Sequence, residues 1–157
     1  MIDFTLTPDQ ELIQQTAREF ANVELAPGVI ERDDKKIWPR EAVQKMGELG
    51  FMGMMTDPKW DGGGMDTISY TVAMEEISRA SASVGLSYAA HSNLCVNQIR
   101  RNGTTEQKQR YLPKLISGKH VGALAMSETG SGSDVISLKL RAEKSGDLYV
   151  LNGTKMW

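Results

Sequence analysis

Apolar residues recur three and four positions apart through most of residues 7–118, a spacing that is typical of amphipathic helices. The first helix is predicted to begin at Thr7, which can form a capping box with Gln10, and to end at Pro27-Gly28. This helix presents one apolar face, so we expect it to pack against a partner.

Residues 33–36 are charged and are predicted to be a solvated connection to a second helix over residues 39–50. Residues 51–66 follow as a loop, because they contain Pro58 and a run of glycines that oppose regular structure. The methionines and Trp60 in this loop favour burial, so we expect it to cover part of the core.

A third helix is predicted from a cap at Asp66 or Thr67 to about Ala80. Its pair Glu75-Glu76 is interpreted as a solvated face or a salt bridge at an interface, because adjacent helical residues do not converge on one site. Residues 83–102 are apolar around much of the helical circumference, which predicts a central helix.

A fifth helix is predicted from Thr104, which can form a second capping box with Gln107, to Gly118. Pro113 lies inside this helix and removes one backbone hydrogen bond. We therefore expect a bend or an irregular last turn at that position.

After residue 118 the apolar pattern changes from helical spacing to the short runs and alternation of strands. A buried strand is predicted over residues 121–126, followed by an alternating strand near 138–143. A turn over 145–147 leads to a strand at 149–151, and Asn152-Gly153 predicts a second hairpin turn into residues 154–157.

Helices first and strands afterwards indicate an α+β fold class. We expect an amino-terminal all-α domain over residues 1–118 and the first strands of an antiparallel β domain over residues 119–157. That second domain is expected to be incomplete, because its strands would leave an open sheet edge at Trp157.

The composition narrows the classes of function. With 18 Lys and Arg against 20 Asp and Glu, the net charge of −2 argues against a nucleic-acid or anionic-membrane partner. Cys95 is the only cysteine, and with only His91 and His120 beside it neither a disulfide nor a metal site is expected. Neither a targeting peptide nor a membrane-spanning run is recognisable, so we expect a cytoplasmic protein.

Residues 125–137, AMSETGSGSDVIS, combine hydroxyl groups, glycines and carboxylates directly after a predicted strand. Gly130 and Gly132 permit positive φ and a close backbone approach, while Ser131 and Ser133 can point at an anion or a polar cofactor ring. The stretch therefore predicts a cofactor loop at the end of a strand.

Three segments, YLPKLISGK, ALAMSETGSGSD and LYVLNGTKMW, resemble the amino-terminal half of the flavin-dependent acyl-CoA dehydrogenases. The resemblance covers the whole chain, and the segment from Met74 to Gly103 looks like the isovaleryl-CoA dehydrogenase branch of that family. It implies a helical domain, a middle β domain that begins near Lys119, and a carboxy-terminal helical domain that is absent from this sequence.

The resemblance also implies that the loop binds FAD. Ser127, by its hydroxyl or backbone, would bond the polar edge of the isoalloxazine ring, and Ser133 would also contact the pantetheine arm or CoA. Gly132 and Ser133 would lie nearer the phosphates, and the other matched residues would lie against the ring. The cofactor-binding residues implied in this way are Leu124, Met126, Ser127, Gly132, Ser133 and Trp157.

The family's reaction is α,β-dehydrogenation of an acyl-CoA, in which a glutamate base removes the α proton and a hydride passes from the β carbon to the flavin. Leu86 and Ala90 match acyl-pocket positions of the isovaleryl branch, and their i, i+4 spacing puts both on one helix face. The small Ala90 would leave room for a short branched chain. The catalytic glutamate would lie beyond Trp157, so we expect no catalytic residue in this chain and no activity from it alone.

The partners implied by the resemblance are the acyl-CoA substrate, an electron-transfer flavoprotein and further copies of the chain in a homotetramer. A non-catalytic helical binding module is the alternative if the chain ends naturally at Trp157. The open strand edge argues against that alternative.

Several residues also have plainer interpretations. Glu128 is expected to bond backbone N–H groups rather than to act as a base. His91 is expected to be a core or pocket-rim residue, and Cys95 a small core residue. Thr129 and Ser131 stand where the family usually has Pro and Ala, so we expect a less rigid loop.

Overall fold

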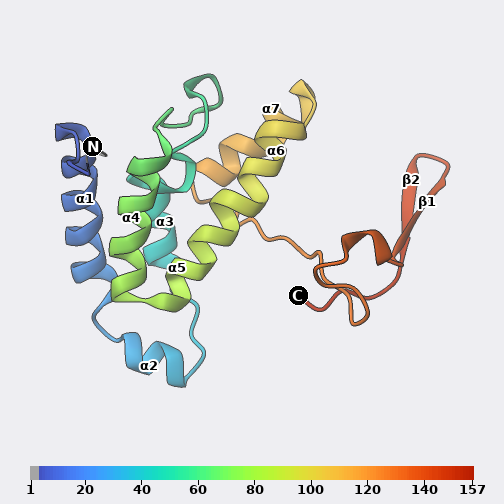
Figure 1. The fold of residues 1–157 in the computed structure, drawn as a ribbon, viewed down its shortest axis with the longest axis horizontal. Helices are drawn as coiled ribbons and strands as arrows, with labels where there is room; N and C mark the ends of the chain where they lie inside the picture. Colours follow the sequence, from blue (N-terminus) through green and yellow to red (C-terminus); the bar gives the residue numbers. More distant parts are fainter. Residues whose placement is uncertain (1–3) are drawn as a thin grey trace. The chain divides into compact units, whose positions relative to one another are not determined.

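The structure is a computed structural model that describes residues 4–157, and it divides into two compact units. The first unit extends to Ala123 and is helical, and the second runs from Leu124 to Trp157 and contains one two-stranded antiparallel sheet (Figure 1). The α+β order of elements is therefore confirmed. The helices are α1 (Pro8–Phe20), α2 (Val29–Asp34), α3 (Arg40–Glu48), α4 (Thr67–Ala80), α5 (Ala82–Ala89), α6 (Asn97–Asn102) and α7 (Thr105–Ile116).

Both predicted capping boxes are present. The Thr7 backbone N–H donates to Gln10 Oε1 at 3.0 Å, and the Gln10 N–H donates to Thr7 Oγ1 at 3.3 Å. Thr104 and Gln107 exchange the same pair of hydrogen bonds at the start of α7. These bonds satisfy amide groups that the first turn of a helix leaves free, so α1 and α7 begin where local chemistry directs them.

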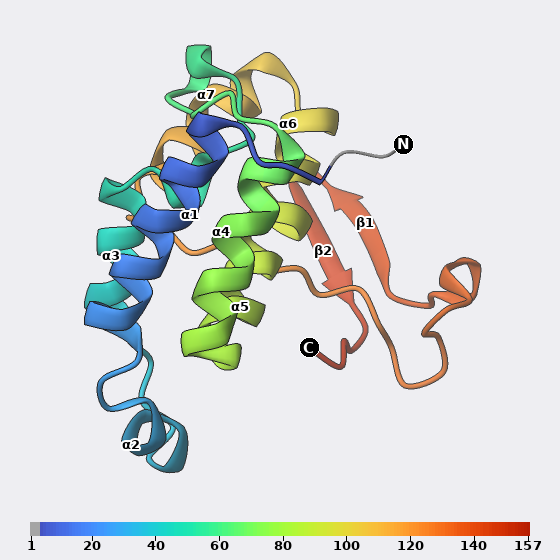
Figure 2. The same ribbon diagram turned by 60° about the vertical axis from the view of Figure 1, so that its left-hand side comes forward.

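The expected solvated connection over residues 33–36 is wrong in its first part, because Asp33 and Asp34 belong to α2. A π-helix, Ala21–Leu25, continues α1, and the guanidinium of Arg32 donates to the carbonyls of Leu25, at its end, and of Pro27, just after it. These bonds fold a charged segment back onto the end of that helix. Figures 1 and 2 show α2 at one end of the helical unit in both views.

The predicted central helix is confirmed over residues 82–102, but it is not a regular α-helix throughout. A π-helix, Ala90–Val96, separates α5 from α6, and the Asn97 N–H bonds back to the carbonyl of Ser92, five residues earlier. Such segments place one extra residue in a helical turn and are common at functional sites. The hydrophobic pattern alone did not indicate it.

The main core lies where α1, α3, α4 and α5 meet the loop after α3. Tyr88 of α5 is 2% exposed, and its hydroxyl donates to the Phe51 carbonyl at 3.1 Å. Phe51, Met52 and Met54 are all buried, which confirms that the glycine-rich loop covers part of the core. A smaller cluster joins Val96 to residues of α7.

The second unit contains β1 (Arg141–Ser145) and β2 (Leu148–Asn152), paired from Arg141↔Asn152 to Ser145↔Leu148. The predicted turn joins them, with Gly146 at φ 61°. All residues of both strands are exposed, in contrast to the buried helical core.

The strands predicted over residues 121–126 and 154–157 are not formed. A strand needs repeated backbone pairing, and here the backbone groups are used differently. The Gly122 N–H donates to the His91 side chain, and the Met126 carbonyl accepts from Lys155 Nζ. The Met156 N–H donates to the carbonyl of Ser127, which lies just after the first of these segments.

The helices of residues 4–157 include none that is long and apolar enough to cross a membrane. Glu76 confirms the salt-bridge alternative for the acidic pair on α4. Its side chain is 5% exposed and accepts hydrogen bonds from Arg18 at 2.7 Å and from Arg79 at 3.0 Å. These bonds, first the one from Arg18, lower the pKa of Glu76 and tie α1 to α4.

Replacing Glu76 by Gln is expected to lower the free energy of unfolding by about 1–3 kcal/mol, because a buried acceptor of charge-assisted bonds is lost. Urea unfolding followed by circular dichroism measures this change. The matched control is Glu75→Gln, because Glu75 is the exposed neighbour on the same helix. Equal unfolding midpoints for the two variants would contradict the prediction.

Candidate functional site

The loop over residues 125–137 is built around a tight turn. Glu128 and Ser131 exchange backbone hydrogen bonds, with the Glu128 N–H donating at 2.9 Å and the Ser131 N–H at 3.0 Å. The buried Ser131 hydroxyl donates to the Asp134 carbonyl, so this serine closes the loop from within. Ser131 therefore adds a hydrogen bond that an alanine at this position could not make.

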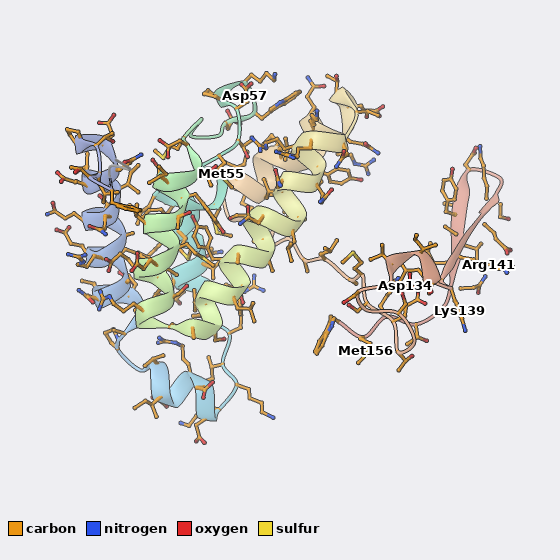
Figure 3. All side chains as sticks on the ribbon, in the orientation of Figure 1. Met55, Asp57, Asp134, Lys139, Arg141 and Met156 are labelled. Carbon is orange, nitrogen blue, oxygen red and sulfur yellow. The ribbon has the colours of Figure 1, made fainter. Side chains whose placement is uncertain are left out.

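The Glu128 carboxylate holds three segments of the second unit together. It accepts the backbone N–H groups of Lys139 at 2.8 Å and Leu140 at 3.0 Å, just before β1. Lys155 Nζ donates to the same carboxylate at 2.9 Å and to the Met126 carbonyl at 2.8 Å. Lys139 leads into the hairpin and Met156 lies in the last segment of the chain (Figure 3), and this carboxylate joins the two regions.

These contacts explain the electrostatics of Glu128. The Lys139 N–H, then the Lys155 ammonium and the Leu140 N–H, lower the pKa of Glu128 to about 2. A carboxylate whose proton is so weakly held is a poor general base. The expectation that Glu128 bonds backbone N–H groups is confirmed.

The residues expected to line a ring have apolar side chains open to solvent. Leu124 is 39% exposed, Met126 45% and Trp157 82%. The Ser127 carbonyl accepts the Met156 N–H at 2.9 Å, which ties Ser127 to the residue before Trp157. Within residues 4–157 the Ser127 hydroxyl has no hydrogen-bond partner, so it is free to bond a ligand.

Gly132 and Ser133 lie on the exposed side of the loop. Neither Gly130 nor Gly132 adopts the positive φ that glycine permits, and a Cβ added at either would meet no atom within 4 Å. The packing of the chain itself therefore does not require glycine at these two positions. An open backbone next to an exposed serine suits the close approach of a ligand.

Leu86 and Ala90 belong to the first unit and lie one helical turn apart, because the Ala90 N–H bonds to the Leu86 carbonyl. Leu86 is 74% exposed, whereas Ala90 begins the π-helix and is partly buried. Their shared face is thus present as expected. The structure describes each unit by itself, so the acyl-pocket role of this face remains a prediction.

A cleft of about 230 Å³ lies beside the turn, between Glu128, Gly130, Lys139 and Gly153. Its lining does not include Ser127 or Ser133. Within residues 4–157 no group of three His, Cys, Asp or Glu side chains is placed to hold a metal ion.

Sequence reasoning missed two contacts that organise this region. Lys155 lies 27 residues from Glu128, and no local pattern links the two. His91 accepts the Gly122 N–H from 31 residues away, which only the packing of the helices brings about. In both cases the pairing is decided by tertiary structure.

Comparison with known protein families agrees with this geometry. Residues 7–119 match the family model described as "Acyl-CoA dehydrogenase, N-terminal domain", which is well over half of the chain. The chain belongs to the acyl-CoA dehydrogenase family. Its resemblance to that family is therefore confirmed.

Known acyl-CoA dehydrogenases resemble this family member along nearly its whole length. The mitochondrial isovaleryl-CoA dehydrogenase of Bos taurus is 51% identical over 97% of this chain. Butyryl-CoA dehydrogenase from Megasphaera elsdenii is 35% identical over 98% of it, with a TM-score of 0.90. An acyl-CoA dehydrogenase from Bacillus anthracis, solved in complex with FAD, is 29% identical over all of it, with a TM-score of 0.92. The chain spans 36%, 41% and 27% of these three proteins.

We expect the carboxyl group of Glu128 to titrate with a midpoint near pH 2, against an ordinary value of 4.5. Because the pKa in the folded protein is the lower one, the carboxylate stabilises the fold above the ordinary pKa, and this contribution is lost as the pH falls towards 2. Carbon-detected NMR of the side-chain carboxyl measures the midpoint. Lys155→Met should raise the titration midpoint of Glu128, whereas Lys144→Met, at an exposed strand position, should not. A Glu128 midpoint at the ordinary value would refute the proposed hydrogen bonds to its carboxylate.

Proposed function

We propose that the polypeptide carrying this sequence binds FAD and dehydrogenates a short branched acyl-CoA similar to isovaleryl-CoA. The observation that carries the proposal is the exposure of three apolar side chains, Leu124, Met126 and Trp157, near the free hydroxyl of Ser127 in the sequence or next to Met156, whose N–H donates to the Ser127 carbonyl. The 51% identity to an isovaleryl-CoA dehydrogenase supports the choice of substrate.

The residues present fit a flavin. A flat aromatic ring with a polar edge needs apolar contact on its face and a hydrogen-bonding group at its rim. Leu124, Met126 and Trp157 would supply the contact, and Ser127 would bond the rim. Bound FAD would accept the hydride that leaves the substrate.

The proposed role of Gly132 and Ser133 is to approach the phosphates and the CoA arm. The open space at Gly132 leaves the backbone accessible, and the Ser133 hydroxyl makes no hydrogen bond within residues 4–157. The Glu128 carboxylate bonds the backbone just before the hairpin and would hold the loop in place before ligand arrives. The loop thus positions ligand and performs no proton transfer.

Leu86 and Ala90 are proposed to form one wall of the acyl pocket. Apolar side chains on one helix face exclude water from a thioester, which favours removal of a proton next to the carbonyl. The small side chain of Ala90 would admit a methyl branch. The catalytic base is proposed to lie outside residues 1–157, and these residues alone to be inactive.

Further parts of the assignment follow from the resemblance to the family and stay predictions. These are a helical domain over residues 1–118 and the first strands of a β domain over 119–157, an electron-transfer flavoprotein as electron acceptor, a homotetramer and a cytoplasmic location. The relative from Bos taurus is mitochondrial.

The encoded polypeptide, purified as the organism makes it, is expected to be yellow and to lose its colour when isovaleryl-CoA is added without oxygen. Absorption near the visible flavin band measures the change. Two controls, addition of buffer alone and addition of free CoA, should leave the colour unchanged. A colourless polypeptide that takes up no added FAD would refute the proposal.

Ala90→Leu is expected to reduce kcat/KM for isovaleryl-CoA about tenfold more than for butyryl-CoA, because the larger side chain fills the space of the methyl branch. Ala82→Leu is the matched control, since Ala82 is exposed at the first turn of α5. Equal losses on the two substrates would show that Ala90 does not shape the branch pocket.

A further inference from the structure

His91 is a fully buried polar residue that the proposed chemistry does not use. It is 0% exposed, lies in the π-helix Ala90–Val96, and its Nδ1 accepts the Gly122 backbone N–H at 2.9 Å. Because Nδ1 accepts, the neutral ring carries its proton on Nε2. Nε2 has no hydrogen-bond partner within residues 4–157, so the ring is retained at some cost.

Gly122 is held on its other side by Cys95. A Cβ added to Gly122 would lie 2.4 Å from Cys95 Sγ and 2.6 Å from Cys95 Cβ. Gly122 does not have a positive φ, so the lack of space, and not its conformation, requires glycine here. His91 and Cys95 are four residues apart on the same helix, and together they form a slot that holds the Gly122 backbone. We call this the His91–Cys95 slot.

The His91 imidazole is held in its neutral form, in which Nδ1 can accept the Gly122 N–H. Burial lowers the pKa of His91 to about 4, and the backbone carbonyls of Met52 and Leu115 offset only part of this shift. Protonation of Nδ1 would also replace an acceptor by a donor facing the Gly122 N–H. At neutral pH the ring therefore remains an acceptor.

The position of the slot in the chain connects two regions of the proposed site. His91 directly follows Ala90, the proposed acyl-pocket residue. Gly122 precedes Leu124, the first proposed ring-lining residue, by two positions. The slot therefore anchors Gly122, after which the chain continues to the flavin loop. The π-helix that forms the slot also carries Ala90, the proposed acyl-pocket residue.

We propose that His91 is a positioning residue: with Cys95 it holds Gly122, and it thereby anchors the end of the helical unit from which the chain continues into the flavin loop. This inference rests on the proposed function. It assigns a role to the π-helix, because the widened turn begins at Ala90 and carries both walls of the slot.

The test uses two substitutions of His91 in the encoded polypeptide with its bound flavin. His91→Leu keeps an apolar volume but removes the acceptor, whereas the amide oxygen of His91→Asn can replace Nδ1 as acceptor for the Gly122 N–H. His120→Leu is the control, because His120 is an exposed histidine.

We expect His91→Leu to reduce kcat per bound flavin about tenfold and to shift the visible flavin spectrum, because small misplacements at reacting centres are costly. His91→Asn should restore both towards the values of the unsubstituted protein, and His120→Leu should change neither. A His91→Leu protein with unchanged spectrum and unchanged kcat per bound flavin would overturn the inference, even if its unfolding midpoint were lower.

Hydrogen exchange of the Gly122 amide tests the slot independently of flavin. We expect slow exchange in the unsubstituted protein and in His91→Asn, and an increase of about tenfold or more in His91→Leu. Rapid exchange in the unsubstituted protein would overturn the slot. Failure of the unsubstituted protein to bind FAD would instead overturn the proposed function, and the slot would then be tested by hydrogen exchange alone. If His91→Leu does not fold, the flavin spectrum and the Gly122 exchange of His91→Asn test the inference, and a change in both would overturn it.

Discussion

Burial of the helix over residues 82–102 is the constraint on which the rest of the helical unit depends. Val84 and Tyr88 pack into the main core, and Val96 packs into the second cluster with α7. Apolar burial of this kind is the largest favourable contribution to folding. The π-helix in the middle of this helix interrupts its regular turns between the two clusters. Two of its residues, His91 and Cys95, contact Gly122 near the end of the helical unit.

The second unit depends on a different kind of interaction. Both apolar core clusters lie before residue 117, and all residues of β1 and β2 are exposed. The segment after Leu124 is held instead by the Glu128 carboxylate, which accepts two backbone N–H groups and the Lys155 ammonium. Charge-assisted hydrogen bonds are directional, so they can fix a loop while leaving its apolar side chains open to a ligand.

The accuracy of the sequence predictions follows the range of the interactions concerned. The helix starts at Thr7 and Thr104 could be predicted because each cap and its partner lie three residues apart. The strand over residues 121–126 was wrong, because its apolar residues indicate a strand only if the backbone finds a pairing partner. The burial of Glu76 was missed for a similar reason, since Arg18 lies on another helix.

The sequence by itself determined that helices precede strands, the capping of α1 and α7, the loop of hydroxyls and glycines, and the family. These properties depend on residues close together in the chain or on whole motifs such as ALAMSETGSGSD. Only the tertiary structure decided that Glu128 joins Lys139 to Lys155, and that His91 and Cys95 enclose Gly122. The physical reason is that a hydrogen bond or a steric limit acts over a few ångströms in space, whatever the separation along the chain.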